Sequence, residues 1–209
     1  MTLIVAIDGP AAAGKGTLAR RLAAGLGLAH LDTGLLYRAV GRRVLDAGQA
    51  PSDPLMAEAA ARALIPADLA RADLRGAEAD RASSLVAKMP GVRAALLAFQ
   101  RDFASRGAVL DGRDIGTVVV PGAQVKLFVT AAPAARARRR WLELQARGIA
   151  TPLAQVEAEL RARDAQDSAR QAAPLVAASD ATILDTTSLD ADAAFAAAME
   201  IVRSRSGFA

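Results

Sequence analysis

The clearest chemical signal in the sequence is a glycine-rich stretch with a single lysine, Gly9-Pro10-Ala11-Ala12-Ala13-Gly14-Lys15-Gly16-Thr17. These residue types suit a phosphate group, because glycines let backbone N–H groups point inward and the lysine adds a full positive charge. The spacing matches the G-x-x-x-x-G-K loop that binds nucleotide triphosphates. The hydroxyl of that pattern stands one position late, at Thr17, since Gly16 follows the lysine. Thr17 can reach either a phosphate or Mg²⁺, and the spacing leaves both open.

Further along, charged residues follow the ends of apolar segments. Val109-Leu110-Asp111 is followed by Gly112-Arg113-Asp114. An aspartate at the end of an apolar strand can hold Mg²⁺, directly or through water. A lone aspartate there is often only a turn or cap residue, but two aspartates on either side of Arg113 disfavour that interpretation. Thr33 and Arg38 also stand just past an apolar segment, where α/β sheets bind ligands.

Arginine dominates the positive charge of the chain. The sequence has 26 Lys and Arg against 22 Asp and Glu, a net charge of +4, and its only lysines are Lys15, Lys88 and Lys126. Arginine recognises phosphate with two parallel hydrogen bonds, so the balance fits nucleic acid or small phosphate esters. The dense run that includes Arg139 and Arg140 predicts a mobile lid that closes on transferring phosphates, because an anion would relieve its like-charge repulsion.

A second basic pattern is ambiguous. Arg163, Asp167 and Arg170 fall at i, i+4 and i+7 of a predicted helix and so share one face. By spacing alone, a surface ladder of salt bridges is the favoured explanation. His30, the only histidine, lies among leucines in a predicted strand, which favours a structural role over a catalytic one.

The elements that must position these residues alternate between strand and helix. Short apolar runs rich in β-branched residues predict strands at 3–7, 28–32, 109–111, 125–129 and 181–184, with helices between them. Residues 55–75 show no strand alternation and predict short helices. The pattern predicts an α/β fold with a five-stranded parallel sheet and helices on both faces.

Composition sets the remaining bounds. The chain has 209 residues, enough for one large domain, with 53% hydrophobic residues, 3% aromatic residues and no cysteine. Disulfides and thiolate zinc sites are therefore excluded. No stretch reaches the roughly 18 apolar residues of a membrane span, so we expect a cytoplasmic monomer that does not bind a membrane.

Taken together, the motifs resemble bacterial cytidylate kinases, in the nucleoside-monophosphate kinase group of P-loop proteins. The resemblance covers nearly the whole chain. Besides the glycine-rich loop it rests on four blocks and the arginine run; the blocks are Leu31-Asp32-Thr33-Gly34-x-x-Tyr37-Arg38, Ser84-x-Val86-Ala87-x-x-Pro90-x-Val92-Arg93, Asp111-Gly112-Arg113-Asp114-x-Gly116-Thr117, and Arg163-Asp164-x-x-Asp167-x-x-Arg170-x-x-Ala173-Pro174-Leu175. The loop is shared by many kinases, whereas the later blocks are specific to this family, in which a glycine at position 16 is usual.

The resemblance implies phosphoryl transfer from ATP to CMP and dCMP with Mg²⁺, and no nucleic-acid partner. It implies that residues 9–17 bind ATP, that Thr17 and Asp111 hold the metal ion, and that Lys15, Arg113 and Arg139 or Arg140 act on the transferring group. It further implies that acceptor binding involves Thr33, Arg38, Arg93 and Arg113 for the phosphate, Ser84, Asp114 and Arg163 for the cytosine, and Asp167 and Arg170 for the sugar and a neighbouring phosphate. The whole chain is then one P-loop kinase domain, with an acceptor lobe at about 33–105 and a lid at about 132–150.

The sequence departs from the family pattern at one place, and two other functions are compatible with its motifs. Such kinases usually carry a small antiparallel insert, which residues 47–75 replace with a short segment that lacks strand alternation. A P-loop kinase of a small hydroxylated metabolite would instead need an aspartate as base, and Asp32, Asp111 or Asp114 could serve. An arginine-rich nucleic-acid binder gated by nucleotide is the third possibility. The absence of an N-K-x-D run disfavours a GTPase switch.

Overall fold

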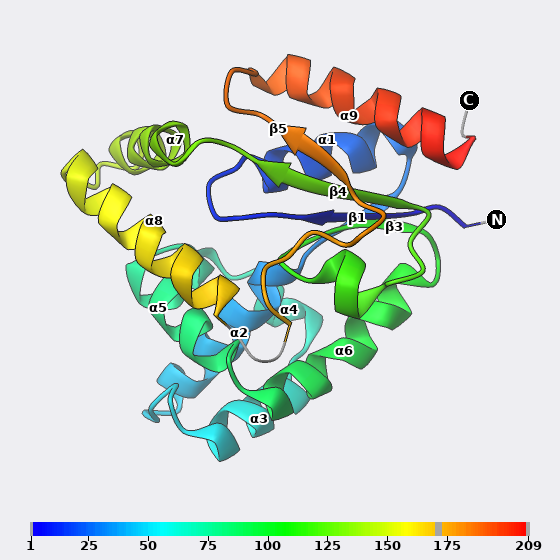
Figure 1. The fold of residues 1–209 in the computed structure, drawn as a ribbon. Coiled ribbons are helices and arrows are strands. Elements are labelled where there is room, and N and C mark those ends of the chain that lie inside the picture. The colour runs from blue at the N-terminus through cyan, green and yellow to red at the C-terminus, as the bar shows by residue number, and fades with distance from the viewer. Residues whose placement is uncertain (1, 170–172, 208–209) are drawn as a thin grey trace. The chain divides into compact units, whose positions relative to one another are not determined.

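The computed structural model describes residues 2–169 and 173–207, and its chain divides into two compact units. One unit comprises residues 1–31 and 104–209, and the other residues 32–103. Figure 1 traces both along the chain. Arg170, one of the predicted site residues, lies outside the described residues. In the described part of the chain, no helix is both long and apolar enough to cross a bilayer.

The first unit is built on a parallel sheet. Its strands are β1 (Ile4–Asp8), β2 (Ala29–Asp32), β3 (Ala108–Asp111), β4 (Val125–Thr130) and β5 (Thr182–Asp185), in the order β2-β3-β1-β4-β5. β1 pairs in parallel with β3 and β4, and β4 pairs in parallel with β5. The five-stranded parallel α/β sheet predicted from the sequence is confirmed. Because β1 is the central strand, the loop that follows it lies at the middle of the sheet's carboxyl edge.

The described part of this unit also contains five helices. They are α1 (Lys15–Leu26), a π-helix η2 (Ile115–Val119), α7 (Pro133–Ala146), α8 (Leu153–Ser168) and α9 (Ala191–Ser206). α1 ends where Gly27 adopts a left-handed φ of 65° and donates its N–H to the last carbonyls of the helix. Pro133 starts α7 in a position where no backbone N–H is needed. The π-helix was not anticipated from the sequence.

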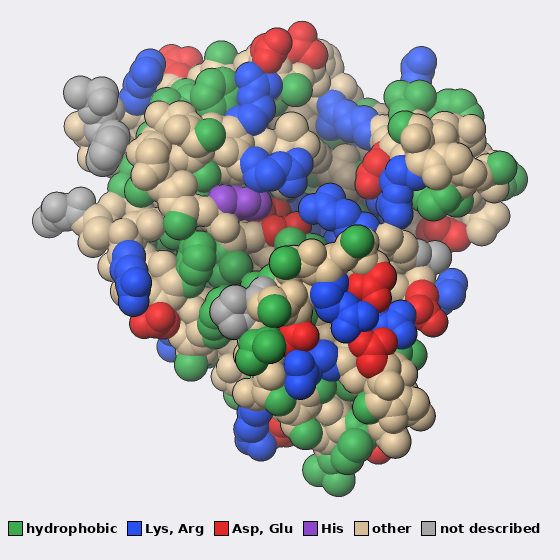
Figure 2. Space-filling model, turned by 180° about the vertical axis from the view of Figure 1, so that it is seen from behind, with side chains coloured by type: hydrophobic (Ala, Val, Ile, Leu, Met, Phe, Trp, Pro, Cys, Tyr) green, Lys and Arg blue, Asp and Glu red, His purple; other side chains and the backbone are tan. Residues whose placement is uncertain are grey.

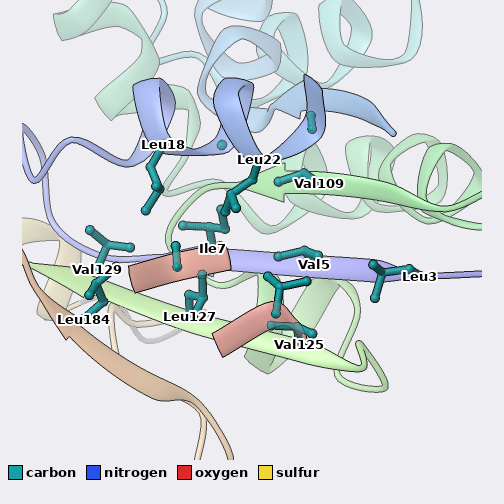
Figure 3. Close-up of a cluster of buried hydrophobic side chains, with 14 of the residues drawn as sticks. Leu3, Val5, Ile7, Leu18, Leu22, Val109, Val125, Leu127, Val129 and Leu184 are labelled. Carbon is teal, nitrogen blue, oxygen red and sulfur yellow. The ribbon is translucent and has the colours of Figure 1, made fainter. Parts of the chain in front are cut away.

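The main core of the unit lies between the sheet and helices α1 and α9. Figure 3 shows Leu18 and Leu22 of α1 pointing at Val5 and Ile7 of β1, with side chains of β3, β4 and β5 beside them. Val5 and Ile7 are fully buried, as is Leu22. Each such side chain contributes roughly 1.5–3 kcal/mol through burial. This packing holds the N-terminus of α1 against the end of β1, and so positions the glycine-rich loop between them.

The second unit is entirely helical. It contains α2 (Thr33–Asp46), α3 (Pro54–Arg62), α4 (Pro66–Leu69), a 3₁₀ turn η1 (Ala72–Leu74), α5 (Ala77–Val86) and α6 (Pro90–Ala104), whose last residue is counted with the first unit. The prediction that residues 55–75 form short helices is confirmed, and no strand replaces the missing insert. α2 packs on α5 so closely that a Cβ at Gly41 would lie 2.7 Å from that of Ala82.

Candidate functional site

The glycine-rich loop leaves β1 in a conformation that few side chains would permit. Gly9 has a φ of +144°, and a Cβ there would lie 2.0 Å from the backbone oxygen of Val129 on β4. Ala12 and Gly14 follow with left-handed φ values of 59° and 89°. A left-handed alanine costs roughly 1–3 kcal/mol, and such strain persists where function requires the shape. The conformation is that of a backbone nest for an anion, at the N-terminus of a helix.

Lys15, the first residue of α1, is the charged group of this loop. Its side chain is only 6% exposed, and its Nζ donates to the carbonyl oxygen of Pro10 at 2.7 Å. Burial lowers the pKa of Lys15 to about 7, and the positive charges of Arg113 and Arg163 lower it further, while Asp111 and Asp8 oppose them. A buried lysine beside two arginines is a site of positive potential that a polyanion would neutralise.

Asp8, the last residue of β1, was missed in the sequence analysis. Its carboxylate accepts the backbone N–H groups of Ile115 at 2.7 Å and Gly116 at 2.8 Å. Burial raises the pKa of Asp8 to about 6, against those two hydrogen bonds and with a smaller contribution from the charge of Asp114. Asp8 thus anchors the start of the π-helix that follows Gly112-Arg113-Asp114. The one available signal was a carboxylate in an otherwise apolar strand.

Asp111 ends β3 beside the loop and is held from one side by histidine. The Nε2 of His30 lies 2.7 Å from one Asp111 carboxylate oxygen. The other oxygen would lie 3.8 Å from a Cβ built on Gly16 and so faces the loop. Figure 2, in which histidine is purple, shows the ring at the surface among acidic and basic side chains. His30 was predicted to be structural; its bond orients Asp111, the predicted metal ligand.

The neighbourhood of Asp111 fits a magnesium ion that also binds a nucleotide. Mg²⁺ prefers one or two carboxylates with water and phosphate oxygens, rather than a cage made only of protein. Asp111 offers the carboxylate oxygen that faces Gly16, and Thr17 offers a hydroxyl, which accepts from Arg20 at 3.4 Å. Among the described residues no group of three His, Cys, Asp or Glu could hold a metal ion alone. The donor set therefore needs phosphate oxygens to be complete.

Arg113, Asp114, Arg163 and Asp167 come together within the first unit. Arg113 Nε donates to the carboxylate of Asp167 at 2.8 Å, and the Asp167 side chain is 3% exposed. Asp114 is buried, and its charge reaches Asp8. The charges of Arg113 and Arg163 both reach Lys15. The stripe on α8 is therefore not a surface salt-bridge ladder at Asp167, which turns inward to the loop after β3.

The two predicted lid arginines have different surroundings. Arg139 donates to the hydroxyl of Thr186 at 3.0 Å and to the carbonyl oxygens of Thr186 and Leu189. It lines a pocket of about 220 Å³, bordered also by Gly14, Thr17, Thr186 and Ala194. Arg140 lies 3.0 Å from Glu143, farther along α7. Of the two, only Arg139 lines the pocket beside the phosphate loop.

The second unit holds four of the predicted acceptor residues, and two of them contact Asp80, an aspartate that was not predicted from the sequence. Arg38 donates to the carboxylate of Asp80 at 2.6 Å, and the Ser84 hydroxyl donates to the backbone oxygen of Asp80 at 2.9 Å. The Arg93 guanidinium lies 5.6 Å from the centre of the Tyr37 ring. Thr33, at the N-terminus of α2, is buried. The four predicted side chains thus belong to one helical unit, and the contact of Arg38 with Asp80 depends on α2 packing against α5.

A parallel sheet whose central strand leads into an anion nest with a buried lysine defines a P-loop nucleotide-binding protein. Comparison with known families narrows this class. Residues 5–204 match the family model described as cytidylate kinase. A cytidylate kinase of Granulibacter bethesdensis is 65% identical over 97% of this chain and 98% of its own, and one of Paramagnetospirillum magneticum is 61% identical over 98% and 100%. The chain belongs to the cytidylate kinase family.

A solved structure agrees with the fold. An uncharacterized protein from Eubacterium ventriosum covers 98% of this chain and 100% of its own with a TM-score of 0.61. The two sequences are 12% identical, so the similarity concerns the fold alone.

Proposed function

We propose that this chain transfers the terminal phosphoryl group of ATP to CMP and dCMP, forming CDP and dCDP. The observation that supports this most directly is the buried Lys15 at the carboxyl edge of the sheet, whose pKa is lowered by burial and by the charges of Arg113 and Arg163. A buried ammonium near two further positive charges is costly unless a polyanion joins them. A kinase brings two polyanions together, and such a cluster would cancel their repulsion.

The donor side follows from the loop. The N–H groups of residues 11–14 and the Lys15 ammonium would bind the phosphates of ATP. The pocket lined by Arg139 and the Thr186–Ala194 segment is next to that loop and would take the nucleobase, with the Arg139 guanidinium against its ring. Thr17 and Asp111 would hold Mg²⁺. When bound, this ion neutralises charge on the phosphate oxygens and orients the donor.

The acceptor needs no strong base. The second pKa of a phosphate monoester is about 6, so near pH 7 the acceptor phosphate is already an anionic nucleophile. The residues then act by alignment and charge, which supply most of the catalysis in phosphoryl transfer. From the sequence resemblance, Arg38, Arg93 and Arg113 are proposed to bind the acceptor phosphate. Ser84, Asp114 and Arg163 would contact the cytosine. Asp167 would contact the sugar.

Several finer points rest on the sequence. Residues 33–105 are proposed as the acceptor lobe, 132–150 as the lid, and Arg140 as a second lid arginine. Arg170 is proposed to bind the acceptor with Asp167. A cytoplasmic monomer is likewise a prediction from the sequence.

A panel of acceptors tests the function. Purified protein is incubated with ATP, Mg²⁺ and one of CMP, dCMP, UMP, AMP or small polyols, and ADP release is followed by a coupled assay. We expect rapid turnover with CMP and dCMP. Turnover of a polyol, with none of CMP, would favour the metabolite kinase with an aspartate base. Inactivity with every acceptor, together with steep salt-dependent retention of RNA, would favour the nucleic-acid binder.

A further inference from the structure

The outer side of the phosphate loop is held by side chains through its carbonyl groups. The oxygen of Ala11 accepts from Arg136 at 3.2 Å, and that of Ala13 accepts from Thr186 at 3.1 Å. In a planar trans peptide, the C=O of one residue points opposite to the N–H of the next. Holding these carbonyls outward therefore turns the following N–H groups toward the other side of the loop, where an anion binds.

Arg136 is the side chain of this set whose guanidinium joins the most segments of the chain. The residue is 6% exposed, and its guanidinium makes three hydrogen bonds in different directions. They go to the carbonyl oxygen of Ala131 at 3.1 Å, to that of Ala11 at 3.2 Å, and to the carboxylate of Asp164 at 2.7 Å. A planar fork with fixed donors can link three segments in this way, whereas a lysine ammonium cannot match the same directions. The phosphate loop, the segment before α7 and the C-terminal half of α8 thus meet at one side chain.

Helix α8 depends on polar contacts of this kind. Among its residues only Val156 and Asp167 are buried. Asp164 pairs with Arg136, and Asp167, three residues later on the same face, pairs with Arg113. With only Val156 as a buried apolar residue, α8 is positioned by these two ion pairs together with its packing along α7. In the described part of the structure the second Asp164 oxygen is buried without a hydrogen-bond partner, so Arg136 is the group that balances this carboxylate.

We propose that Arg136 is a positioning residue that links the ATP-binding loop to α8, the helix with the acceptor residues Arg163 and Asp167. The proposal rests on the proposed function for the identity of the two substrates. Arg136 does not line the pocket beside the phosphate loop. It acts through Ala11 on the N–H groups that face the donor phosphates, and through Asp164 on the orientation of α8.

The two contacts of Arg136 predict two separable effects. Removing the guanidinium releases both the loop and α8, so binding of both nucleotides should weaken. Removing only the Asp164 charge releases α8, while Arg136 still holds Ala11. A residue needed merely for folding would lower thermal stability without this separation between donor and acceptor.

The test compares Arg136→Gln, Arg136→Lys and Asp164→Asn with a control on α8, Arg161→Gln. The Arg161 side chain is 74% exposed and pairs with Glu157 on the surface of the same helix. Binding of ATP alone and of CMP alone is measured by titration calorimetry, beside kcat and thermal unfolding. We expect Arg136→Gln to weaken ATP and CMP about tenfold or more each, because a charged, buried hydrogen-bond donor is lost.

Asp164→Asn should weaken CMP by about tenfold and leave ATP binding within about threefold of the wild type. Arg136→Lys should recover part of the ATP affinity, and Arg161→Gln should change nothing. ATP binding by folded Arg136→Gln within twofold of the wild type would overturn the proposal. If that variant does not fold, equal effects of Asp164→Asn on ATP and CMP would overturn it. Because ATP binding is measured without an acceptor, failure of the wild type to phosphorylate CMP would be a distinct result.

Discussion

The guanidinium of Arg113 and the carboxylate of Asp167 form an ion pair of 2.8 Å, although 54 residues separate them in the chain. Both are proposed acceptor residues, and each restricts the rotamers of the other. The pair joins the loop after β3 to α8. It also keeps the Arg113 charge close enough to Lys15 to lower the lysine pKa. One contact therefore connects the acceptor residues with the lysine of the donor loop.

Asp167→Asn should weaken CMP far more than ATP. The substitution keeps the shape of the side chain and removes the charge that orients Arg113. We therefore expect the KM for CMP to rise roughly 30- to 150-fold, which corresponds to a loss of about 2–3 kcal/mol of binding free energy. The KM for ATP should change less than about threefold. Steady-state kinetics with each substrate varied measures both values, with the exposed Glu159→Gln on the same helix as control. Equal losses for the two substrates would remove Asp167 from the acceptor site.

Lys15→Ala should reduce kcat by about 10² to 10³, or roughly 3–4 kcal/mol of transition-state stabilisation. The reason is that the only ammonium of the phosphate loop is lost where charge develops on the transferring group. Turnover is measured at saturating ATP and CMP. Lys88→Ala, on an exposed lysine, should leave turnover unchanged. An unaltered rate in the Lys15 variant would rule out its assigned role.

ATP binding should take up close to one proton at pH 8. With its pKa lowered to about 7, Lys15 is mostly neutral there, and the phosphates would raise that pKa again. Calorimetry in Tris and in HEPES gives the proton number from the difference in observed enthalpy. Lys15→Ala should abolish the uptake. In the free protein the unfolded state binds the extra proton between about pH 7 and 10.5, so the Lys15 contribution to the free energy of unfolding rises with pH across that window.

A buffer-independent enthalpy for the wild type would contradict the lowered pKa. The same result in wild type and Lys15→Ala would show that the proton binds elsewhere.

Gly41→Val should destabilise the helical unit. A Cβ at this position would lie 2.7 Å from the Cβ of Ala82 and 3.1 Å from its backbone carbon, so α2 and α5 would have to separate. Overpacking of this kind costs about 1–3 kcal/mol. Urea unfolding measures the difference. Gly122→Val, where a Cβ meets nothing within 4 Å, is the matched control and should stay within about 0.5 kcal/mol of the wild type. Equal stability of the two variants would contradict the close packing of α2 on α5.

Much of the fold was predictable because its signals are local. β1 is a run of five residues with β-branched side chains, and the glycines around Lys15 permit the turn that follows it. The helical nature of residues 55–75 followed from the lack of alternation. The π-helix after Asp114 was not predictable, because its N–H groups are held by Asp8, 107 residues away.

The phosphate loop, the parallel sheet and the kind of charge around the site could be predicted from residue types alone, since each depends on neighbouring residues and their periodicity. Which charges meet could be seen only in the folded chain. The pairing of Arg136 with Ala11 and Asp164, of His30 with Asp111, and of Arg38 with Asp80 joins distant segments. The physical reason is that a hydrogen bond depends on the positions of two atoms to within tenths of an ångström, and packing of the whole core sets those positions.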